Sequence, residues 1–532
     1  TYRLSMGAYS ETMNFYEHLF GDALVSFNKT WNDFTVAATA GASFTKEVTH
    51  GTYLNAEGDQ YYEVDVTDAN GITYKMPQGN VYFPNIFHRD NYYDIYYQEN
   101  YTKKRLNSVF GTLQLGYKDM VYLDLTARND WSSALAFTES MSFFYPSVGA
   151  TFLLDEMFHM NDDLFDMVKL RASYSVVGND IPAYYSRPVA TLSKLTITLP
   201  TVMPFTDWKP EKTFSIEAGF DLAMLHNRLR TEFTFYKANT KNQYFQVSAP
   251  VASGYSKRNI NAGNVENLGI EASLSYRLDF NHDWSWTPGI NFSYNKNEIK
   301  ELCPGLEEYN LAEASAFIMK LKKGGSYGDI YTYDFQYDDN GNIKLDNTGA
   351  PLLTSDADTY AGNFNSKFHL GWSNTINWKN LNIYALVDGK IGGKVLSMTE
   401  AIMDGYGVSK ATGDARLNGG VPNKDGSMID AEKYYSRVGG RAQNAGFNAM
   451  EYMYSATNFR LRELSVGYTF ENLFGMNKNL TASVVGRNLF FLYKKSPCDP
   501  DISGSTGNGW QGIDVFSLPA TRSWGLNLKL NF

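Results

Sequence analysis

Acidic and glycine-rich segments are the first places where this chain of 532 residues could carry chemistry. Segment 338–342 (DDNGN) is superficially similar to a calcium loop, but Ile343 stands where an EF-hand needs glycine and no glutamate closes the coordination. A β-turn is the better interpretation. Segment 504–509 (GSTGNG) has neither the glycine spacing nor the strand-to-helix context of a phosphate-binding loop, so it predicts a flexible loop.

Histidines, cysteines and carboxylates also give no pattern that predicts catalysis. The seven histidines form no HExxH motif, and most lie singly in expected turns or loops. Cys303 and Cys498 are far apart and form no CxxC pair, so neither a disulfide framework nor a zinc module is predicted, and the state of the two thiols stays open. Carboxylates are abundant but scattered, with no spacing that marks a catalytic pair. We therefore predict no enzyme, no cofactor and no metal site.

Charge and hydropathy exclude two further classes of protein. The formal net charge is -10, which removes the broad basic field that nucleic-acid binding needs. No apolar run approaches the ~18 residues of a spanning helix, whereas a spanning β-barrel is compatible with polar average hydropathy because its strands alternate. Aromatic residues make up 15% of the chain, and these favour strands and membrane interfaces.

Strands with period-two alternation run from end to end and predict an all-β protein. In segment 523–532 (SWGLNLKLNF), apolar side chains alternate with polar ones, and segment 267–280 repeats the pattern. We expect about fifteen such strands of roughly 9 to 14 residues, the length that a tilted strand needs to cross a bilayer. An odd number cannot close an antiparallel barrel, so either one strand is miscounted or further strands precede Thr1.

The connections decide between a barrel and a soluble sandwich. Tight polar turns such as 118–119 and 379–380 alternate with long connections, which is typical of a spanning antiparallel β-barrel with short periplasmic turns and long external loops. A sandwich gives no reason for this regularity. The expected extracellular loops are about 47–104, 177–212, 240–267, 297–364, 392–457 and 491–521. The short-turn side has one exception, 155–166, where we expect a helical turn at the rim.

The predicted strand faces and loops then supply candidate site residues. Charged side chains that alternate with apolar ones are costly in lipid, about 2 to 4 kcal/mol near mid-bilayer for Arg or Lys, so they indicate the face toward a lumen. The lumen-lining candidates are Arg128, Arg171, Arg230, Glu271, Arg277 and His369. Aromatic residues of the long loops offer flat faces for sugars or peptide side chains, or for packing between loops and against a partner. The substrate-binding candidates are Tyr331, Tyr333, Tyr435 and Trp510.

Several segments, in order, resemble the barrel signatures of one family, the SusC/RagA-type TonB-dependent transporters of the Gram-negative outer membrane. The resemblance covers about residues 106–532, and each motif alone is weak whereas the ordered set is specific. The motifs are 127–133 (ARNDWSS) with 145–149 (YPSVG), 170–174 (LRASY), 209–213 (KPEKT) with 217–221 (EAGFD), 261–267 (NAGNVEN), 458–462 (NFRLR), 486–489 (GRNL), 499–501 (DPD) and 519–522 (PATR). Segment 338–342 departs from the family's DxNGDG turn, which puts any inherited role of that turn in doubt.

The resemblance implies that this chain is the C-terminal part of a 22-stranded outer-membrane barrel, whose plug domain and TonB-contacting segment are not in this sequence. It implies active import of an oligosaccharide or oligopeptide, energised through TonB, with a SusD-like surface lipoprotein as a lid. A dimer of such transporter–lipoprotein pairs is left open. The alternatives are a passive porin or adhesion-type outer-membrane barrel, and a secreted all-β carbohydrate-binding protein.

Overall fold

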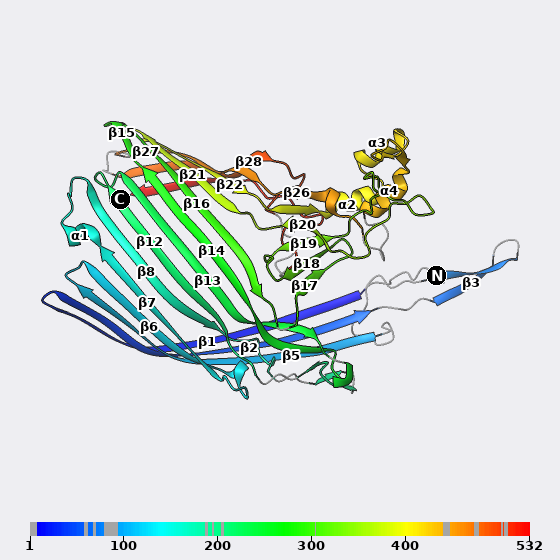
Figure 1. The fold of residues 1–532 in the computed structure, drawn as a ribbon, viewed down its shortest axis with the longest axis horizontal. Coiled ribbons are helices and arrows are strands. Elements are labelled where there is room, and N and C mark those ends of the chain that lie inside the picture. Colours follow the sequence, from blue (N-terminus) through cyan, green and yellow to red (C-terminus); the bar gives the residue numbers. More distant parts are fainter. Residues whose placement is uncertain are drawn as a thin grey trace.

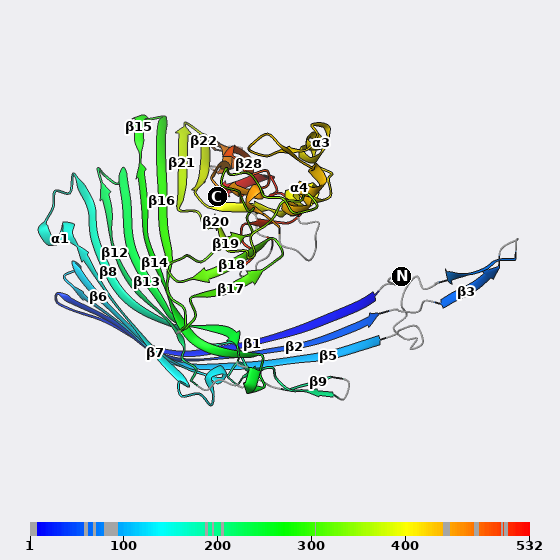
Figure 2. The ribbon, with the colours of Figure 1, turned by 45° about the vertical axis from the view of Figure 1, so that its right-hand side comes forward.

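The computed structural model describes residues 8–57, 62–67, 71–78, 94–186, 190–193, 196–203, 207–249, 251–303, 305–439, 447–472, 478–501, 504 and 509–531. Its main feature is one large curved sheet of antiparallel strands (Figures 1 and 2). In chain order the long strands are β1 (Ala8–Trp31), β2 (Phe34–Glu57), β5 (Asp94–Tyr117), β6 (Val121–Ser132), β7 (Ser142–Leu153), β8 (Phe165–Asn179), β12 (Glu211–Met224), β13 (Leu229–Ser248), β14 (Lys257–Tyr276), β16 (Trp284–Glu301), β21 (Phe368–Trp378), β22 (Leu381–Ile391), β27 (Asn458–Phe470), β28 (Asn479–Lys494) and β30 (Ser523–Asn531).

Each long strand pairs with the next one along the chain, so the sheet is a simple meander. The sheet has 17 strands among the described residues. Two of these are minor: β15 (Leu278–Asn281) continues the line of β14, and β11 (Val202–Met203) is a short parallel pairing on β14. The remaining fifteen confirm the predicted number.

The two faces of the sheet differ in polarity, as the alternation predicts. On β30 the apolar side chains Trp524, Leu526, Leu528 and Leu530 are exposed by 69%, 69%, 62% and 41%. Across the pairing they meet Gly486, Val484, Ala482 and Leu480 of β28, which continue the apolar face. A two-layer sandwich would bury these leucines under a second sheet, so the exposed face contradicts that alternative.

The sheet is a curved wall rather than a closed cylinder in the part of the chain that the structure describes (Figures 1 and 2). There, β1 pairs only with β2, and β30 pairs only with β28. The all-β fold with about fifteen barrel strands is therefore confirmed. The 22-stranded closed barrel and its plug remain predictions.

Short and long connections alternate between the two ends of the wall. Two-residue or three-residue turns lie at one end, for example 32–33, 118–120 and 379–380. The expected helical turn at that end is present as α1 (Leu154–Phe158). The loop expected at 240–267 is wrong in extent, because β13 and β14 stay paired from Leu229–Tyr276 out to Ser248–Lys257 and leave only 249–256 as a connection. Cross-strand hydrogen bonds satisfy the backbone there, so the strands continue beyond the length that a bilayer requires.

Three long connections fold together into a compact body, which we call the loop subdomain: residues 302–367, 392–457 and 495–522. Its strands and helices are β17 (Glu308–Glu313), β18 (Phe317–Lys322), β19 (Asp329–Thr332), β20 (Thr359–Asn363), β23 (Lys394–Ser397), β24 (Val421–Pro422), β25 (Met428–Ile429), β26 (Met453–Ser455), β29 (Ile513–Asp514), α2 (Met398–Gly405), α3 (Lys410–Leu417) and α4 (Ala431–Val438). None of the helices in the described part of the chain is long and apolar enough to span a membrane.

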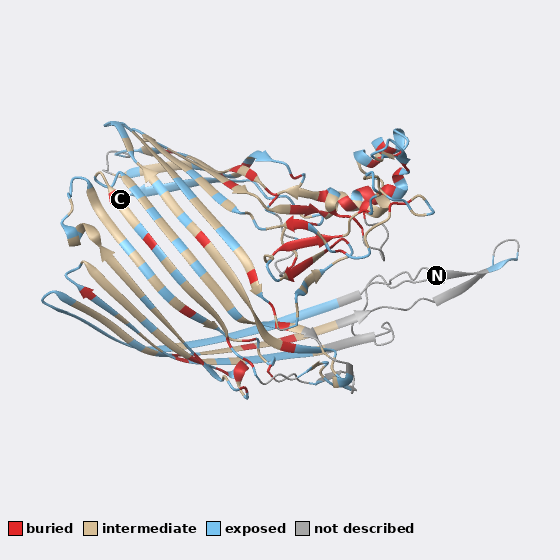
Figure 3. Ribbon diagram, in the orientation of Figure 1, coloured by how far each residue is buried: buried red, intermediate tan, exposed pale blue. Residues whose placement is uncertain are grey.

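An apolar core holds the loop subdomain together, and Figure 3 shows that buried residues concentrate there. Phe317, Ile330, Leu396, Val438 and Ile513 are at most 1% exposed. They come from all three connections, and β23 pairs with β29 in parallel to link two of them. At ~25 cal/mol per Å² of apolar surface removed from water, such side chains provide the main stabilisation of the subdomain.

Candidate functional site

A polar chamber lies between the loop subdomain and the polar face of the wall. Its volume is about 750 Å³, within the range of small-molecule sites. Strands β14, β21 and β22 contribute Glu271, His369 and Lys390, and the loop subdomain contributes Asp329 and Asp501. Cations and carboxylates are both present, so the chamber carries no strong charge of one sign.

Neutral hydrogen-bonding groups and aromatic rings make up much of the chamber lining. The asparagines are Asn267, Asn295, Asn297, Asn363 and Asn365, and the tyrosines are Tyr236, Tyr294, Tyr327 and Tyr360. Such a lining can pair with the hydroxyl groups of a sugar or the amide groups of a peptide, while the rings supply flat contact surfaces.

Asparagine side chains tie the loop side of the chamber to the wall. The Asn297 carboxamide oxygen accepts from the backbone N–H of Tyr327 at 2.8 Å, and its amide donates to Asn267 at 3.0 Å. On the loop side, Asn365 donates to the carbonyl oxygen of Tyr327 at 2.7 Å. Burial, followed by the nearby carboxylate of Asp329, raises the pKa of Tyr360, and the Tyr360 hydroxyl has Asp329 as a hydrogen-bond partner.

Six charged residues form a network that fastens the loop subdomain to the wall, and we call it the ionic clamp. Its members are Asp388 and Lys390 of β22, Arg460 and Arg462 of β27, and Asp499 and Asp501 of the connection after β28.

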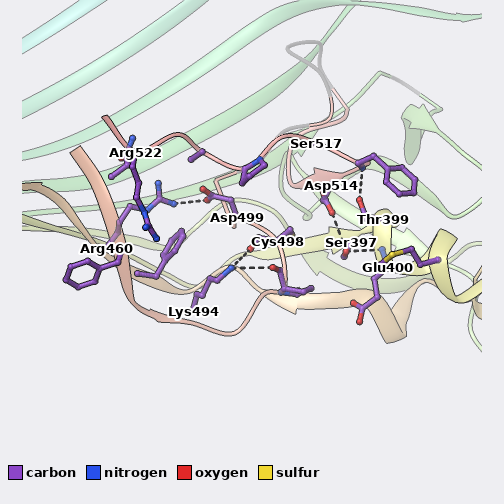
Figure 4. A pocket seen from close by; sticks show the side chains of 18 residues that line it. Ser397, Thr399, Glu400, Arg460, Lys494, Cys498, Asp499, Asp514, Ser517 and Arg522 are labelled. Atoms are coloured by element: carbon purple, nitrogen blue, oxygen red, sulfur yellow. Dashed lines mark hydrogen bonds and ion pairs between the residues drawn. The ribbon is translucent and has the colours of Figure 1, made fainter. Parts of the chain in front are cut away.

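The centre of the clamp is a buried ion pair. Arg460 Nη2 lies 2.7 Å from Asp499 Oδ1, with side-chain exposures of 3% and 8% (Figure 4). The Arg460 guanidinium also stacks 4.0 Å from the centre of the Phe491 ring. A buried pair contributes little net stability, but loss of one partner leaves the other charge uncompensated, so the pair specifies where the connection sits.

Asp501 joins the clamp to the chamber. Lys390 Nζ lies 2.7 Å from Asp501 Oδ1, and Arg462 Nη2 lies 3.3 Å from Asp501 Oδ2. Burial raises the pKa of Asp501, but the cations Lys390, Arg460 and Arg462 outweigh it and hold the pKa below its usual value. The carboxylate is therefore ionised at neutral pH; it accepts hydrogen bonds from Lys390 and Arg462 and forms an ion pair with Arg460 at 3.4 Å.

A second cavity of about 620 Å³ lies beside the clamp, between α2 and the end of β28 (Figure 4). Its walls are linked internally: Ser397 donates to Asp514 at 3.4 Å and accepts from the backbone N–H of Glu400 at 3.3 Å. Cys498 is half-buried here, and both it and Cys303 are free thiols. Burial raises the pKa of the Cys498 thiol, which keeps it protonated.

The structure brings together three of the six lumen-lining candidates. Arg171, Glu271 and His369 line one depression of about 590 Å³ on the polar face, together with Asp388 and Arg462 of the clamp. Arg171 also contacts Asp221 of the neighbouring strand at 3.4 Å. The lumen-lining role stays a prediction, and these positions are compatible with it.

The other three lumen-lining candidates lie apart and have local partners. Arg128 donates to Asp130 at 2.8 Å and to Ser108 at 2.7 Å. Near the short-turn end, Arg230 donates to Asn227 at 3.2 Å and Arg277 donates to Asp279 at 2.9 Å. These contacts stabilise the wall and do not extend into the chamber.

The four loop aromatics predicted to bind substrate are placed differently from one another. Tyr331 is only 8% exposed and its ring centre lies 5.6 Å from that of Tyr360. Trp510 is half-buried and packs edge-on against Phe317 at 5.4 Å. Tyr333 is half-buried, and so is Tyr435, which contacts Tyr434. Loop-to-loop packing therefore accounts for Tyr331 and Trp510, and the substrate role of the four remains a prediction.

Comparison with known proteins identifies the family of this chain. The model of the family described as "TonB dependent receptor-like, beta-barrel" matches residues 2–388. The chain belongs to this family. Among curated relatives of this TonB-dependent receptor chain, TonB-dependent receptor P3 of Formosa agariphila is 24% identical over 96% of the chain and 52% of the relative. TonB-dependent receptor SusC of Bacteroides thetaiotaomicron is 23% identical over 81% of the chain and 44% of the relative.

Solved structures share the fold of this TonB-dependent receptor chain. The RagAB peptide importer in its open-open state matches with a TM-score of 0.74 and 19% identity, covering 99% of the chain and 55% of that structure. The RagAB peptide transporter matches with a TM-score of 0.73 and 20% identity, covering 99% and 56%. The chain thus spans about half the length of the relatives it matches. The family model, the curated relatives and the shared fold together confirm the predicted SusC/RagA-type resemblance, and membership of the family confirms the predicted outer-membrane location.

Most of the chamber and the whole ionic clamp were not predicted from the sequence as functional elements. Two of the three clamp segments, 458–462 and 499–501, are family motifs, yet nothing in the sequence pairs them. A signal was present in their composition, because two arginines and two aspartates recur at the same two-residue spacing. On the extended strand β27 that spacing places Arg460 and Arg462 on one side, whereas Asp499 and Asp501 are brought together by a turn in which the backbone N–H of Asp501 donates to Asp499 at 3.0 Å.

Proposed function

We propose that this TonB-dependent receptor chain forms the wall and the outer loop platform of an active importer for an oligosaccharide or an oligopeptide. The observation that carries the proposal is the neutral polar chamber of about 750 Å³ between the wall and the loop subdomain. Its size suits part of an oligomer, and its asparagines and tyrosines suit polar uncharged groups. Binding, rather than a change in covalent bonds, is the proposed role, and the chain is not an enzyme in this proposal.

The energy source and the partners belong to the same proposal. In it, TonB acts on a plug domain outside this sequence, and a SusD-like lipoprotein covers the chamber from the loop side. The resemblance to SusC and the fold shared with RagAB support a lidded importer. The proposal also includes a dimer of such transporter–lipoprotein pairs. Measuring the oligomeric state in detergent would test it.

An uptake experiment tests the energy source. Cells that produce the full-length protein are given fluorescent panels of neutral oligosaccharides and oligopeptides, and uptake is compared with a variant that lacks the TonB-contacting segment. We expect uptake of at least one panel to fall to the level of cells without the protein. Undiminished uptake in the deletion would reject active transport and favour the porin alternative.

A pair of matched substitutions tests the chamber. Tyr360 is 54% exposed and lines the chamber, whereas Tyr337 is 48% exposed and lies outside it. Loss of one ring contact of about 0.5–1.5 kcal/mol predicts that Tyr360→Ala weakens apparent affinity for the transported compound by roughly threefold to tenfold. Tyr337→Ala should leave it unchanged. If the two substitutions had equal effects on apparent affinity, the chamber would not be part of the transport path.

A further inference from the structure

Three cations lie together on the apolar face of the wall, at the outer end of its apolar band. Lys46 of β2 pairs directly with Arg105 of β5, and Lys103 lies two positions further out on β5. The pairing of β2 with β5 has no register shift, so these side chains share the face of the exposed residues Val109 and Tyr117. We call Lys46, Lys103 and Arg105 the basic cluster.

The basic cluster carries more positive charge than its neighbours neutralise. Lys46 Nζ lies 2.6 Å from a carboxylate oxygen of Glu17. Lys103 and Arg105 are exposed, and their side chains have no hydrogen-bond or ion-pair partner in the described part of the chain. Like charges directly opposite each other on paired strands destabilise a sheet. An anion bound at the cluster would offset this repulsion.

Aromatic residues of the same face show where the basic cluster lies relative to the bilayer. Phe34 and Tyr117, whose ring centres are 4.9 Å apart, lie beside the short turns. Phe44 and Trp131 are the next exposed aromatic residues outward on β2 and β6, and both pair with Asn107. The two aromatic levels are about ten positions apart, which matches the ~9–11 residues of a tilted strand that crosses a bilayer. The basic cluster begins just beyond the second level, at the headgroups of the leaflet on the long-connection side.

A shallow apolar depression lies on the same face, deeper in the apolar band. Its volume is about 440 Å³, and strands β5, β6, β7 and β8 line it (Figure 1). Leu113, Leu125 and Val148 are neighbours in the register and line the depression, and Gly111 contributes no side chain. From Arg105 to Gly111 the strand rises about 20 Å, which a tilt of roughly 40° turns into about 15 Å of depth. This is half of the ~30 Å hydrocarbon core, so one acyl chain reaches from the basic cluster to the depression.

We propose that the basic cluster and the depression bind one phosphorylated glycolipid of the outer leaflet, namely lipopolysaccharide through its lipid A part. A phosphate monoester of lipid A accepts hydrogen bonds from Lys103 and Arg105, and one acyl chain lies in the depression. The monoester carries a charge of about −1.5 to −2 at neutral pH, which complements these two cations. The phosphate diester of a phospholipid supplies only one negative charge. This site is separate from the chamber and does not depend on which compound is transported.

Native mass spectrometry of the delipidated full-length protein in detergent tests the proposal. The probes are bisphosphorylated lipid A, the same lipid A after removal of its phosphates, and phosphatidylglycerol. We expect one molecule of lipid A to stay bound, and removal of the phosphates to weaken binding about 100-fold because two charge-assisted hydrogen bonds are lost. Absence of bound lipid A, or equally tight binding of the dephosphorylated form or of phosphatidylglycerol, would overturn the proposal.

Charge substitutions locate the phosphate on the wall. Arg105→Gln should weaken lipid A binding about tenfold, the effect of losing one charge-assisted hydrogen bond. Lys29→Gln is the matched control, since Lys29 is exposed on the same face near the short turns, and it should have no effect. The heat-modifiable folded band on gels checks that both variants fold. Equal weakening by the two substitutions would show an effect of net charge alone and would contradict the assignment.

Filling the depression tests the place of the acyl chain. A Cβ atom added to Gly111 would lie 3.6 Å from the carbonyl oxygen of Thr39, which is an ordinary contact, so Gly111→Leu fits without a backbone clash. This substitution should weaken lipid A binding about tenfold, the loss of contact with roughly two methylene groups. Ala482→Leu on the same face of β28 is the matched control and should leave binding unchanged. Unchanged affinity in Gly111→Leu would contradict the proposal.

Discussion

The substitution Asp499→Ala tests most directly whether the ionic clamp attaches the loop subdomain to the wall. The substitution removes the carboxylate that lies 2.7 Å from Arg460 and leaves a guanidinium that is 3% exposed. Loss of one partner of a buried ion pair costs about 3–5 kcal/mol. Arg460 retains Asp501 at 3.4 Å, so we expect the lower end, about 3 kcal/mol, for local detachment of the connection.

Hydrogen exchange in the full-length protein measures this local detachment. The backbone N–H of Leu396 donates to the Gly512 carbonyl at 2.8 Å, and that of Phe516 donates to Thr399 at 2.6 Å. Both amides are protected only while the subdomain stays assembled. A cost of about 3 kcal/mol predicts that their exchange becomes about 100-fold faster.

Two controls make this measurement specific. Asp414→Asn breaks the pair Lys410–Asp414, which is exposed by 87% and 52% and should change exchange little. The double substitution Arg460→Met with Asp499→Leu replaces the buried pair with apolar side chains and should restore most of the protection. If Asp499→Ala changes exchange no more than Asp414→Asn does, the ionic clamp does not hold the subdomain.

Three further predictions concern the core, the lipid face and pH. Phe317→Ala, at a core position 1% exposed, should cost about 3–5 kcal/mol and speed tryptic cleavage within 302–367, whereas Phe516→Ala at 59% exposure should not. Leu526→Arg should destabilise the wall by about 2–4 kcal/mol if it lies at mid-bilayer and reduce the heat-modifiable folded band on gels, with Asn527→Arg on the polar face as the unaffected control. The folded-state pKa of Asp501 is depressed, so its stabilising contribution is complete above the unfolded pKa of about 3.9 and is lost as the pH falls through the folded value. Near-ultraviolet circular dichroism should therefore show loosening below about pH 4, and Asp501→Asn should flatten that change; a profile identical in both proteins would reject the assignment.

Much of the wall could be predicted from the sequence because strand signals are local. A side chain on a strand alternates between two faces every residue, so the order of residues reports polarity of each face directly. The strand around Leu526 could be predicted in this way, and so could the turn at 379–380 between β21 and β22. The full length of β13 and β14 could not be predicted, because the outer halves of these strands have mixed composition. Their backbone N–H and C=O groups form hydrogen bonds with each other, which the sequence does not show.

The site depends on contacts between segments that are distant in the sequence. Arg460 meets Asp499 across 39 positions, and Lys390 meets Asp501 across 111. Tyr331 and Tyr360 looked equivalent to any other loop aromatic, yet one is buried and the other lines the chamber. A loop has no periodic pattern that indicates which of its side chains will be buried. Burial here depends on other loops, which supply the rest of the core.

The sequence by itself determined the fold class, the approximate number of strands in this chain and the polarity of the two faces of each strand. These properties follow from alternation along one segment at a time and from the strict meander, in which each strand pairs with its neighbour in the chain. Tertiary structure alone decided how three long connections combine into one subdomain, which aromatic rings it buries and where the cavities open. Those outcomes depend on packing among segments that are far apart in the sequence.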